Sequence, residues 1–195
     1  MNISKPSAGR LVRTAAAGAI TAGLGLGGLL GAGGAAHAST HPDGYVVIMN
    51  CTSVSGSVSY SPGLRTSAFR NATAVLTGTT SGCSNIYSGG LSGTGTIFAS
   101  LSGKSDVKSE NWTGTFTIDW PASSGFNPSN GNLTVTDSSG TEVAQGTITS
   151  GAFVSDPINL SYVITGKTGQ GTKAKPVTKQ TYINSQPLNL SENTG

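Results

Sequence analysis

From Tyr45 onward, apolar residues recur at every second position in short runs, separated by glycine and by clusters of Asn, Asp or Ser. In the clearest run, residues 112–120, Trp, Gly, Phe, Ile and Trp alternate with three threonines and an aspartate. Alternation of this kind places the two sets of side chains on opposite faces of a β-strand. No segment here keeps helical apolar spacing for three turns. The region is therefore predicted to be all-β.

Turn signals separate these runs at short intervals. Asn130-Gly131 and Ser139-Gly140 are two of them, and such pairs are typical of tight hairpins. About eight to ten short strands joined in this way predict an antiparallel β-sandwich, immunoglobulin-like in outline, in preference to a barrel. We expect one domain over residues 45–195, with the last strand near residues 182–190.

The N-terminal segment has the pattern of a signal peptide. Positive residues precede a long apolar run, and Ala36-His37-Ala38 supplies small residues for cleavage between Ala38 and Ser39. Residues 1–38 are thus predicted to be removed, and residues 39–44 to form a flexible lead-in. A retained membrane anchor is the less favoured alternative, because glycines break the run and no positive stop-transfer flank follows it. We expect a secreted or wall-associated protein without a membrane span after processing.

The balance of acidic and basic residues argues against one class of partner, nucleic acids. The whole chain carries a formal net charge of +3, but three of its basic residues lie in the predicted signal peptide. The eight basic and eight acidic residues after residue 38 cancel. A nucleic-acid partner is not predicted, because such proteins need net positive charge to neutralise phosphates.

The two cysteines, Cys51 and Cys83, both follow the predicted cleavage site. An even pair in an exported chain predicts one disulfide. The alternatives are a metal pair, which lacks partner ligands, and a reactive thiol, which lacks a histidine.

Several low-complexity elements resemble those of a group of small exported actinobacterial proteins. They are residues 51–64 (CTSVSGSVSYSPGL), residues 76–79 (LTGT), Cys83 and residues 91–96 (LSGTGT). The resemblance covers about half of the chain that follows the signal peptide. It implies an exported β-sandwich with no assigned activity, and it offers no catalytic or binding residues to carry over.

Residues for common catalytic chemistries are scarce. After the predicted cleavage site, His41 is the one histidine, and it lies in the flexible lead-in. Serine and cysteine hydrolases and histidine-rich zinc sites need a rigidly held histidine. We therefore predict no enzyme, no cofactor and no metal site.

A hydrolase that uses two carboxylates is the remaining catalytic alternative, because it needs only a suitably spaced pair of acids. The candidates are Asp106, Glu110, Asp119, Glu142 and Asp156. Asp106 and Glu110 alternate with lysines, which favours a charged surface turn. Asp119 lies on the threonine face of its strand, where a solvated aspartate is ordinary.

Aromatic residues give an ambiguous signal. Trp112, Phe116 and Trp120 share one face of their strand, and such a row on an exposed sheet could stack against sugar rings. This would make the protein a carbohydrate-binding module. The favoured interpretation is that Trp112 and Trp120 lie in the core, because the opposite face is polar and one face must turn inward.

A run of lysines gives the second signal. Lys167, Lys173, Lys175 and Lys179 occur with no acid between Asp156 and Glu192. The run is interpreted either as a solvated hairpin loop that discourages aggregation or as a contact for a polyanion. Our leading hypothesis is a non-enzymatic protein of the cell envelope or the extracellular space that works by surface contact. Its partner is unknown; a cell-wall polymer and another envelope protein are the two kinds considered.

Overall fold

The computed structural model describes residues 45–138 and 140–193. The predicted signal peptide, its cleavage site at Ala38 and Ser39, and the lead-in lie outside the described residues. Within them, the alternating pattern forms an antiparallel sheet, so the all-β prediction is confirmed.

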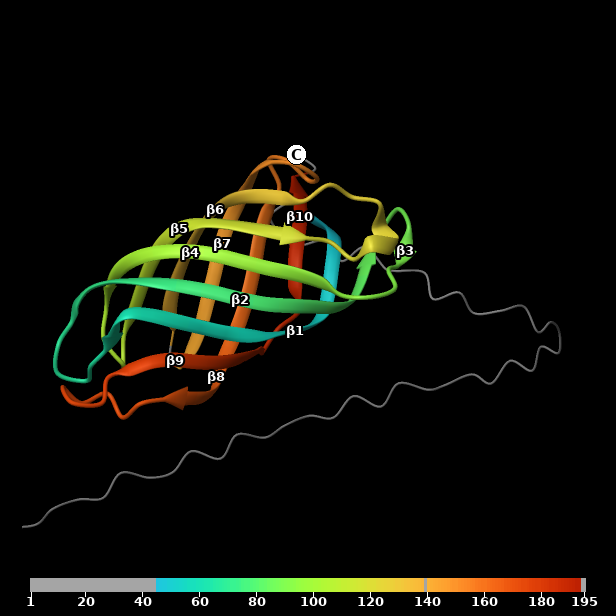
Figure 1. Cartoon of the computed structure of the whole chain (residues 1–195). Helices are drawn as coiled ribbons and strands as arrows, with labels where there is room; N and C mark the ends of the chain where they lie inside the picture. Colours follow the sequence, from blue (N-terminus) through green and yellow to red (C-terminus); the bar gives the residue numbers. More distant parts are fainter. Residues whose placement is uncertain (1–44, 139, 194–195) are drawn as a thin grey trace, which may run out of the picture. The chain divides into compact units, whose positions relative to one another are not determined.

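Ten strands and one short 3₁₀ helix make up the described fold (Figure 1). In chain order they are β1 (Tyr45–Leu64), β2 (Arg70–Asn85), β3 (Gly89–Gly90), β4 (Gly95–Ser105), β5 (Glu110–Asp119), η1 (Ala122–Ser124), β6 (Ser129–Ser138), β7 (Thr141–Ser150), β8 (Pro157–Thr168), β9 (Val177–Asn184) and β10 (Leu188–Asn193).

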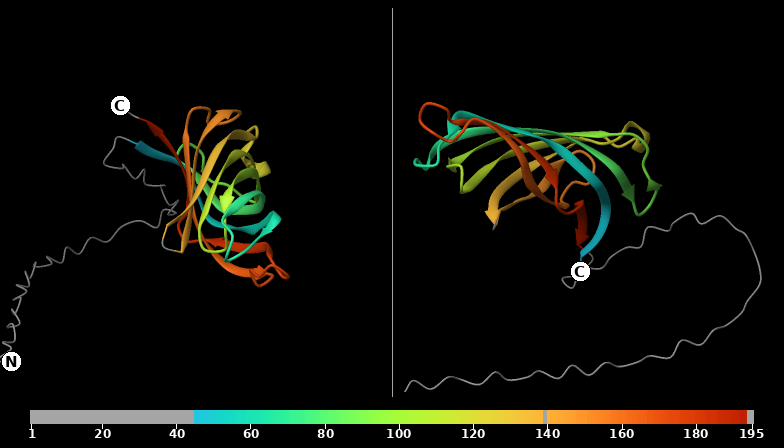
Figure 2. Two further views of the ribbon diagram at one scale, coloured as in Figure 1. Left: turned by 90° about the vertical axis from the view of Figure 1, so that its left-hand side faces the viewer. Right: turned by 90° about the horizontal axis from the view of Figure 1, so that it is seen from below.

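One sheet closes on itself instead of forming two packed sheets. β1, β2, β4, β5, β6, β7, β8 and β9 pair each with the next, and β9 pairs with β1. The result is an eight-stranded barrel, which Figure 2 shows from one end and from below. The predicted sandwich is not confirmed. Alternation is the same in both architectures, because each strand turns one face inward in either, and only the β1–β9 pairing decides between them.

The first and last strands meet beside the closure. β1 is 20 residues long; its first part pairs with β10 and its later part pairs with β9. β10 also pairs with β8 at two positions, so it fills the place where β9 has already ended. Tyr45 therefore lies opposite Asn193, and both ends of the described chain leave the barrel at the same end. The single strand expected near residues 182–190 is instead the end of β9 followed by β10.

Large aromatic side chains fill the barrel where glycines leave room. Tyr182 on β9 pairs with Gly56 on β1, which pairs with Gly78 on β2. The hydroxyl of Tyr182 donates a hydrogen bond to the carbonyl of Thr77 on β2, at 3.4 Å. The ring therefore extends over both glycines, and the alternation of large and small residues fills the interior.

The disulfide prediction is confirmed. Cys51 and Cys83 lie directly opposite each other in the β1–β2 pairing and are bonded, and both are buried. The bond closes a loop of 32 residues in the sequence.

Candidate functional site

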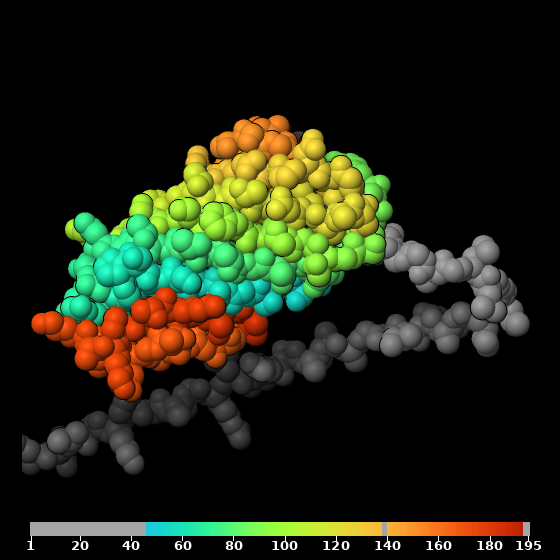
Figure 3. All heavy atoms as spheres, in the orientation of Figure 1, coloured from blue at the N-terminus to red at the C-terminus, as the bar shows by residue number. Residues whose placement is uncertain are grey.

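The basic residues gather at one end of the barrel. In an up-and-down sheet, alternate connections lie at the same end, which here carries the β1–β2, β4–β5, β6–β7 and β8–β9 connections. All eight basic residues of the described chain lie in these connections or near the adjoining strand ends: Arg65, Arg70, Lys104, Lys108, Lys167, Lys173, Lys175 and Lys179. We call this the basic end. Figure 3 shows the teal β1–β2 segment and the orange-red β8–β9 segment together on the left.

The predicted lysine loop is the β8–β9 connection, and it has a defined conformation. The amides of Gln170 and Thr172 both donate to the carbonyl of Lys175, at 2.9 and 3.2 Å. The loop is also tied to the β1–β2 connection, because the amide of Thr66 donates to the carbonyl of Gly171 at 2.9 Å. The four lysines of the run are exposed. The loop presents Lys173 and Lys175, and Lys167 and Lys179 lie on the adjoining ends of β8 and β9.

Two arginines at the basic end have donors that no described group uses. The Nε atoms of Arg65 and Arg70 are covered and have no hydrogen-bond partner among the described residues. The guanidinium of Arg70 does donate to the carbonyl of Gly63 through Nη2. Unpaired covered donors are costly.

The acids near the surface of the basic end are engaged by their own turns. The Asp106 carboxylate accepts hydrogen bonds from the amides of Lys108 and Ser109, at 2.7 and 2.8 Å. The Asp137 carboxylate accepts one from the amide of Gly140 at 3.0 Å. Eight basic residues outnumber these two acids at this end.

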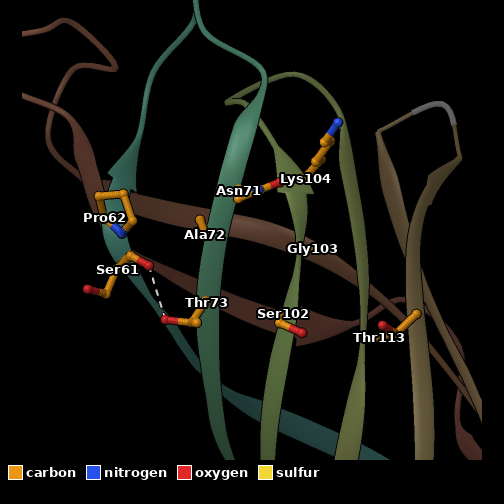
Figure 4. A pocket seen from close by; sticks show the side chains of 9 residues that line it. All are labelled: Ser61, Pro62, Asn71, Ala72, Thr73, Ser102, Gly103, Lys104 and Thr113. Atoms are coloured by element: carbon orange, nitrogen blue, oxygen red, sulfur yellow. Dashed lines mark hydrogen bonds between the residues drawn. The ribbon is translucent and has the colours of Figure 1, made fainter.

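A hollow of about 610 Å³ lies on the outer wall of the barrel next to the basic end (Figure 4). Four hydroxyl-bearing residues stand side by side across it on β1, β2, β4 and β5, because Ser61 pairs with Thr73, Thr73 with Ser102, and Ser102 with Thr113. The Thr73 hydroxyl donates to the carbonyl of Ser61 at 3.0 Å. The hollow therefore offers a row of small polar groups on an otherwise regular sheet surface.

A second row borders the hydroxyls on the side of the basic end. Asn71 on β2 pairs with Lys104 on β4, and both residues line the hollow and are exposed. Gly103 on β4 also lines it and contributes no side chain. One cation, one amide and four hydroxyls thus share this surface.

Two acids are buried inside the barrel at the same end. Glu110 accepts hydrogen bonds from Trp112 Nε1 at 2.8 Å and from the Tyr60 hydroxyl at 3.0 Å. Burial raises the pKa of Glu110, and these two hydrogen bonds partly oppose the shift. The expected surface turn is therefore wrong for Glu110, which is 7% exposed. The signal was its position two residues before Trp112, which places both side chains on one face.

Glu142 is the second buried acid. It pairs with Tyr162 on the neighbouring strand, and its Oε2 atom has no hydrogen-bond partner among the described residues. Burial, followed by the charges of Glu110 and Asp137, raises the pKa of Glu142 to about 8. The carboxyl is therefore mostly protonated at neutral pH and can act as a hydrogen-bond donor.

The other predicted acids lie elsewhere. Asp119, at the far end of β5, is exposed and accepts a hydrogen bond from Thr96 at 3.2 Å. Asp156 lies in the β7–β8 connection, where burial and the charge of Glu192 raise its pKa to about 6. Among the five candidates, the charge of Glu110 raises the pKa of Glu142, and the charge of Asp106 raises the pKa of Glu110. Among residues 45–138 and 140–193, no group of three or more His, Cys, Asp or Glu side chains is placed to hold a metal ion.

Both tryptophans are buried, so their predicted place in the core is confirmed. Trp112 is 1% exposed and stacks on Tyr60, with ring centroids 5.7 Å apart. Trp120 is 6% exposed, packs edge-to-face on Phe153 and donates to Ser129 Oγ at 2.9 Å. They do not form the exposed, coplanar platform that sugar stacking would need.

The chain matches no protein-family model, and comparison with curated proteins and with solved structures finds no similar protein.

None of the helices in the described part of the chain is long and apolar enough to cross a membrane.

Proposed function

We propose that this is an exported, non-enzymatic surface-contact protein that binds an anionic polymer of the cell envelope through its basic end. The observation that carries the proposal is the gathering of the cations at one end, where they outnumber the acids Asp106, Glu110, Asp137 and Glu142. All eight basic residues of residues 45–193 lie at one end, whereas Asp119, Asp156 and Glu192 lie at the other. A net charge near zero hides this polarity, and the local field decides which partner approaches which end.

The half-buried Arg65 and Arg70 add two guanidinium groups to the exposed lysines of the basic end. Single exposed charge pairs contribute little, but a polymer with repeating anionic groups contacts several cations at once. Because the β8–β9 loop already has a defined conformation, less conformational entropy is lost when a partner binds to it. Binding by this mechanism weakens as salt rises, because the exposed charges are screened.

Export is part of the proposal and is supported by the N-terminal sequence pattern and by the disulfide, since such bonds persist in oxidising compartments. The resemblance to small exported actinobacterial proteins agrees with it. The absence of enzymatic activity is likewise proposed. It is supported by the burial of Glu110 and Glu142, which leaves their carboxyls little access to a substrate.

The test is co-sedimentation of the purified, oxidised chain (residues 39–195). The binding partners are cell-wall sacculi with and without their phosphate polymers, cellulose, chitin and anionic vesicles, each at two salt concentrations. The proposal expects salt-sensitive pelleting with phosphate-bearing sacculi and none with neutral polysaccharides. Salt-insensitive pelleting with a neutral polysaccharide would contradict it, as would no pelleting with any partner.

Two charge-matched variants sharpen the test. Lys173→Ala/Lys175→Ala removes two positive charges from the basic end. Ala122→Glu/Asn127→Glu adds two negative charges to exposed positions at the opposite end, so both variants have the same net charge. The first should weaken binding to phosphate-bearing sacculi, and the second should leave it unchanged. Equal weakening would show that net charge, not the basic end, decides binding.

A further inference from the structure

We propose that the hollow on the outer wall binds one repeat unit of a phosphodiester-linked polyol or sugar polymer. Lys104 would contact the phosphate, and the row of Ser61, Thr73, Ser102 and Thr113 would contact the hydroxyls of the unit. This inference rests on the proposed function and names the chemical class of its partner.

The arrangement of the hollow suits such a unit. Neighbouring strands lie about 4.8 Å apart, so the four residues offer hydroxyls at regular intervals across β1, β2, β4 and β5. A hydroxyl both donates and accepts hydrogen bonds, which matches the hydroxyls of a polyol. The hollow gives the unit space of its own beside the cations.

The position of Lys104 connects the hollow to the basic end. Lys104 is the one basic residue of the hollow's lining, and its neighbour Asn71 adds an amide. A lysine ammonium is a compact charge that suits phosphate. The other cations, on the loops and on β8 and β9, would then contact the phosphates of flanking units.

An extended polymer fits this placement better than a lipid surface does. The hollow lies on the side of the barrel, over β2, β4 and β5, whereas a flat membrane would meet the loop tips. Phe69, in the β1–β2 connection, is 54% exposed at that end, so anionic vesicles belong in the test as the rival partner.

The experiment compares poly(ribitol phosphate), inorganic polyphosphate and anionic vesicles as probes for the same oxidised chain. Ser102→Trp fills the middle of the hollow without changing charge. Thr147→Trp makes the same change at an exposed position on β7, outside the hollow. The Ser102→Trp variant should bind poly(ribitol phosphate) about tenfold or more weakly than the wild type, because two or more hydrogen bonds are lost. Its binding to polyphosphate should stay unchanged. Thr147→Trp should alter neither.

Lys104→Gln supplies the second variant, since it removes the charge and leaves a slightly shorter polar side chain. It should weaken poly(ribitol phosphate) binding more than Lys108→Gln does. The inference is overturned if Ser102→Trp leaves poly(ribitol phosphate) binding intact, if it weakens both polymers equally, or if the vesicles bind most tightly. If binding to both polymers still depends on Lys173 and Lys175 in those cases, the proposed function stands and only the hollow is excluded.

Discussion

At the scale of single residues, the barrel interior holds two acids close to one another. The carboxylate of Glu110 is satisfied by Trp112 and Tyr60, but one oxygen of Glu142 has no partner among the described residues. A buried carboxyl without a partner favours its neutral form. The stability of the fold should therefore depend on pH through Glu142.

Glu142→Gln should make the protein more stable at alkaline pH. Between about pH 4.5 and 8 the folded state keeps a proton on Glu142 that the unfolded chain releases, so the free energy of unfolding falls as pH rises through that window. The variant mimics the protonated acid and should gain on the order of 2 kcal/mol relative to the wild type at pH 9. Urea unfolding at pH 4.5, 7 and 9 measures this.

The control is Asp119→Asn, which changes an exposed carboxyl on the outer face. It should leave the fall in stability between pH 4.5 and 9 as it is in the wild type. A Glu142→Gln protein with the same fall would show that Glu142 ionises freely in the folded state.

At the scale of elements, Gly56 on β1 and Gly78 on β2 leave room for the side chain of Tyr182, which extends from β9. A Cβ atom at Gly56 would lie 2.0 Å from the carbonyl oxygen of Thr77 and 2.7 Å from the Tyr182 hydroxyl. Gly56→Ala should thus destabilise the fold by about 1–3 kcal/mol, because backbone must move. Thermal unfolding measures the change.

Gly90→Ala is the matched control for that substitution. A Cβ at Gly90 would meet no atom within 4 Å. The midpoint temperature of thermal unfolding should therefore remain near that of the wild type. If both variants unfold at the wild-type midpoint, the packing of Tyr182 over β1 and β2 is not as described.

The disulfide acts on the same pair of strands. Replacing both cysteines by serine frees a loop of 32 residues in the unfolded chain, which in the chain-entropy model costs about 3–4 kcal/mol. Chemical denaturation of the double variant and of the oxidised wild type gives the difference. A difference near zero would mean that the β1–β2 pairing does not depend on the bond.

The sequence predicts the strands and their inward and outward faces well, but it does not predict that the sheet closes into a barrel. The alternation in residues 112–120 correctly places Trp112 and Trp120 inside, since burial follows the pleat. It does not reveal that Tyr182 pairs with Gly56, because that contact joins positions far apart in the chain. Glu110 follows the pleat as well: it is buried on the face of Trp112, although the lysines beside it in the sequence favour an exposed turn.

The candidate site was predictable in part. The lysine run marks the β8–β9 connection correctly as an exposed hairpin loop. This loop lies at the same end of the barrel as the other basic residues, Arg65, Arg70, Lys104 and Lys108. That placement depends on which connections share an end, and therefore on the whole topology. The hollow depends in addition on the register of four strands, which no local pattern contains.

The molecule as a whole is a barrel with little net charge that presents its cations at one end. Tyr45 and Asn193, the first and last described residues, pair with each other at the opposite end.

The most direct test of this claim is a map of the contact surface by NMR. Poly(ribitol phosphate) would be added at low salt to the oxidised, ¹⁵N-labelled chain, and amide shifts would be followed residue by residue. Binding at the basic end predicts shifts confined to residues 61–73, 102–113 and 167–179, and these shifts should fade as salt is added. Shifts centred on residues 120–128 and 151–156 at the opposite end, or no shifts at all, would contradict it.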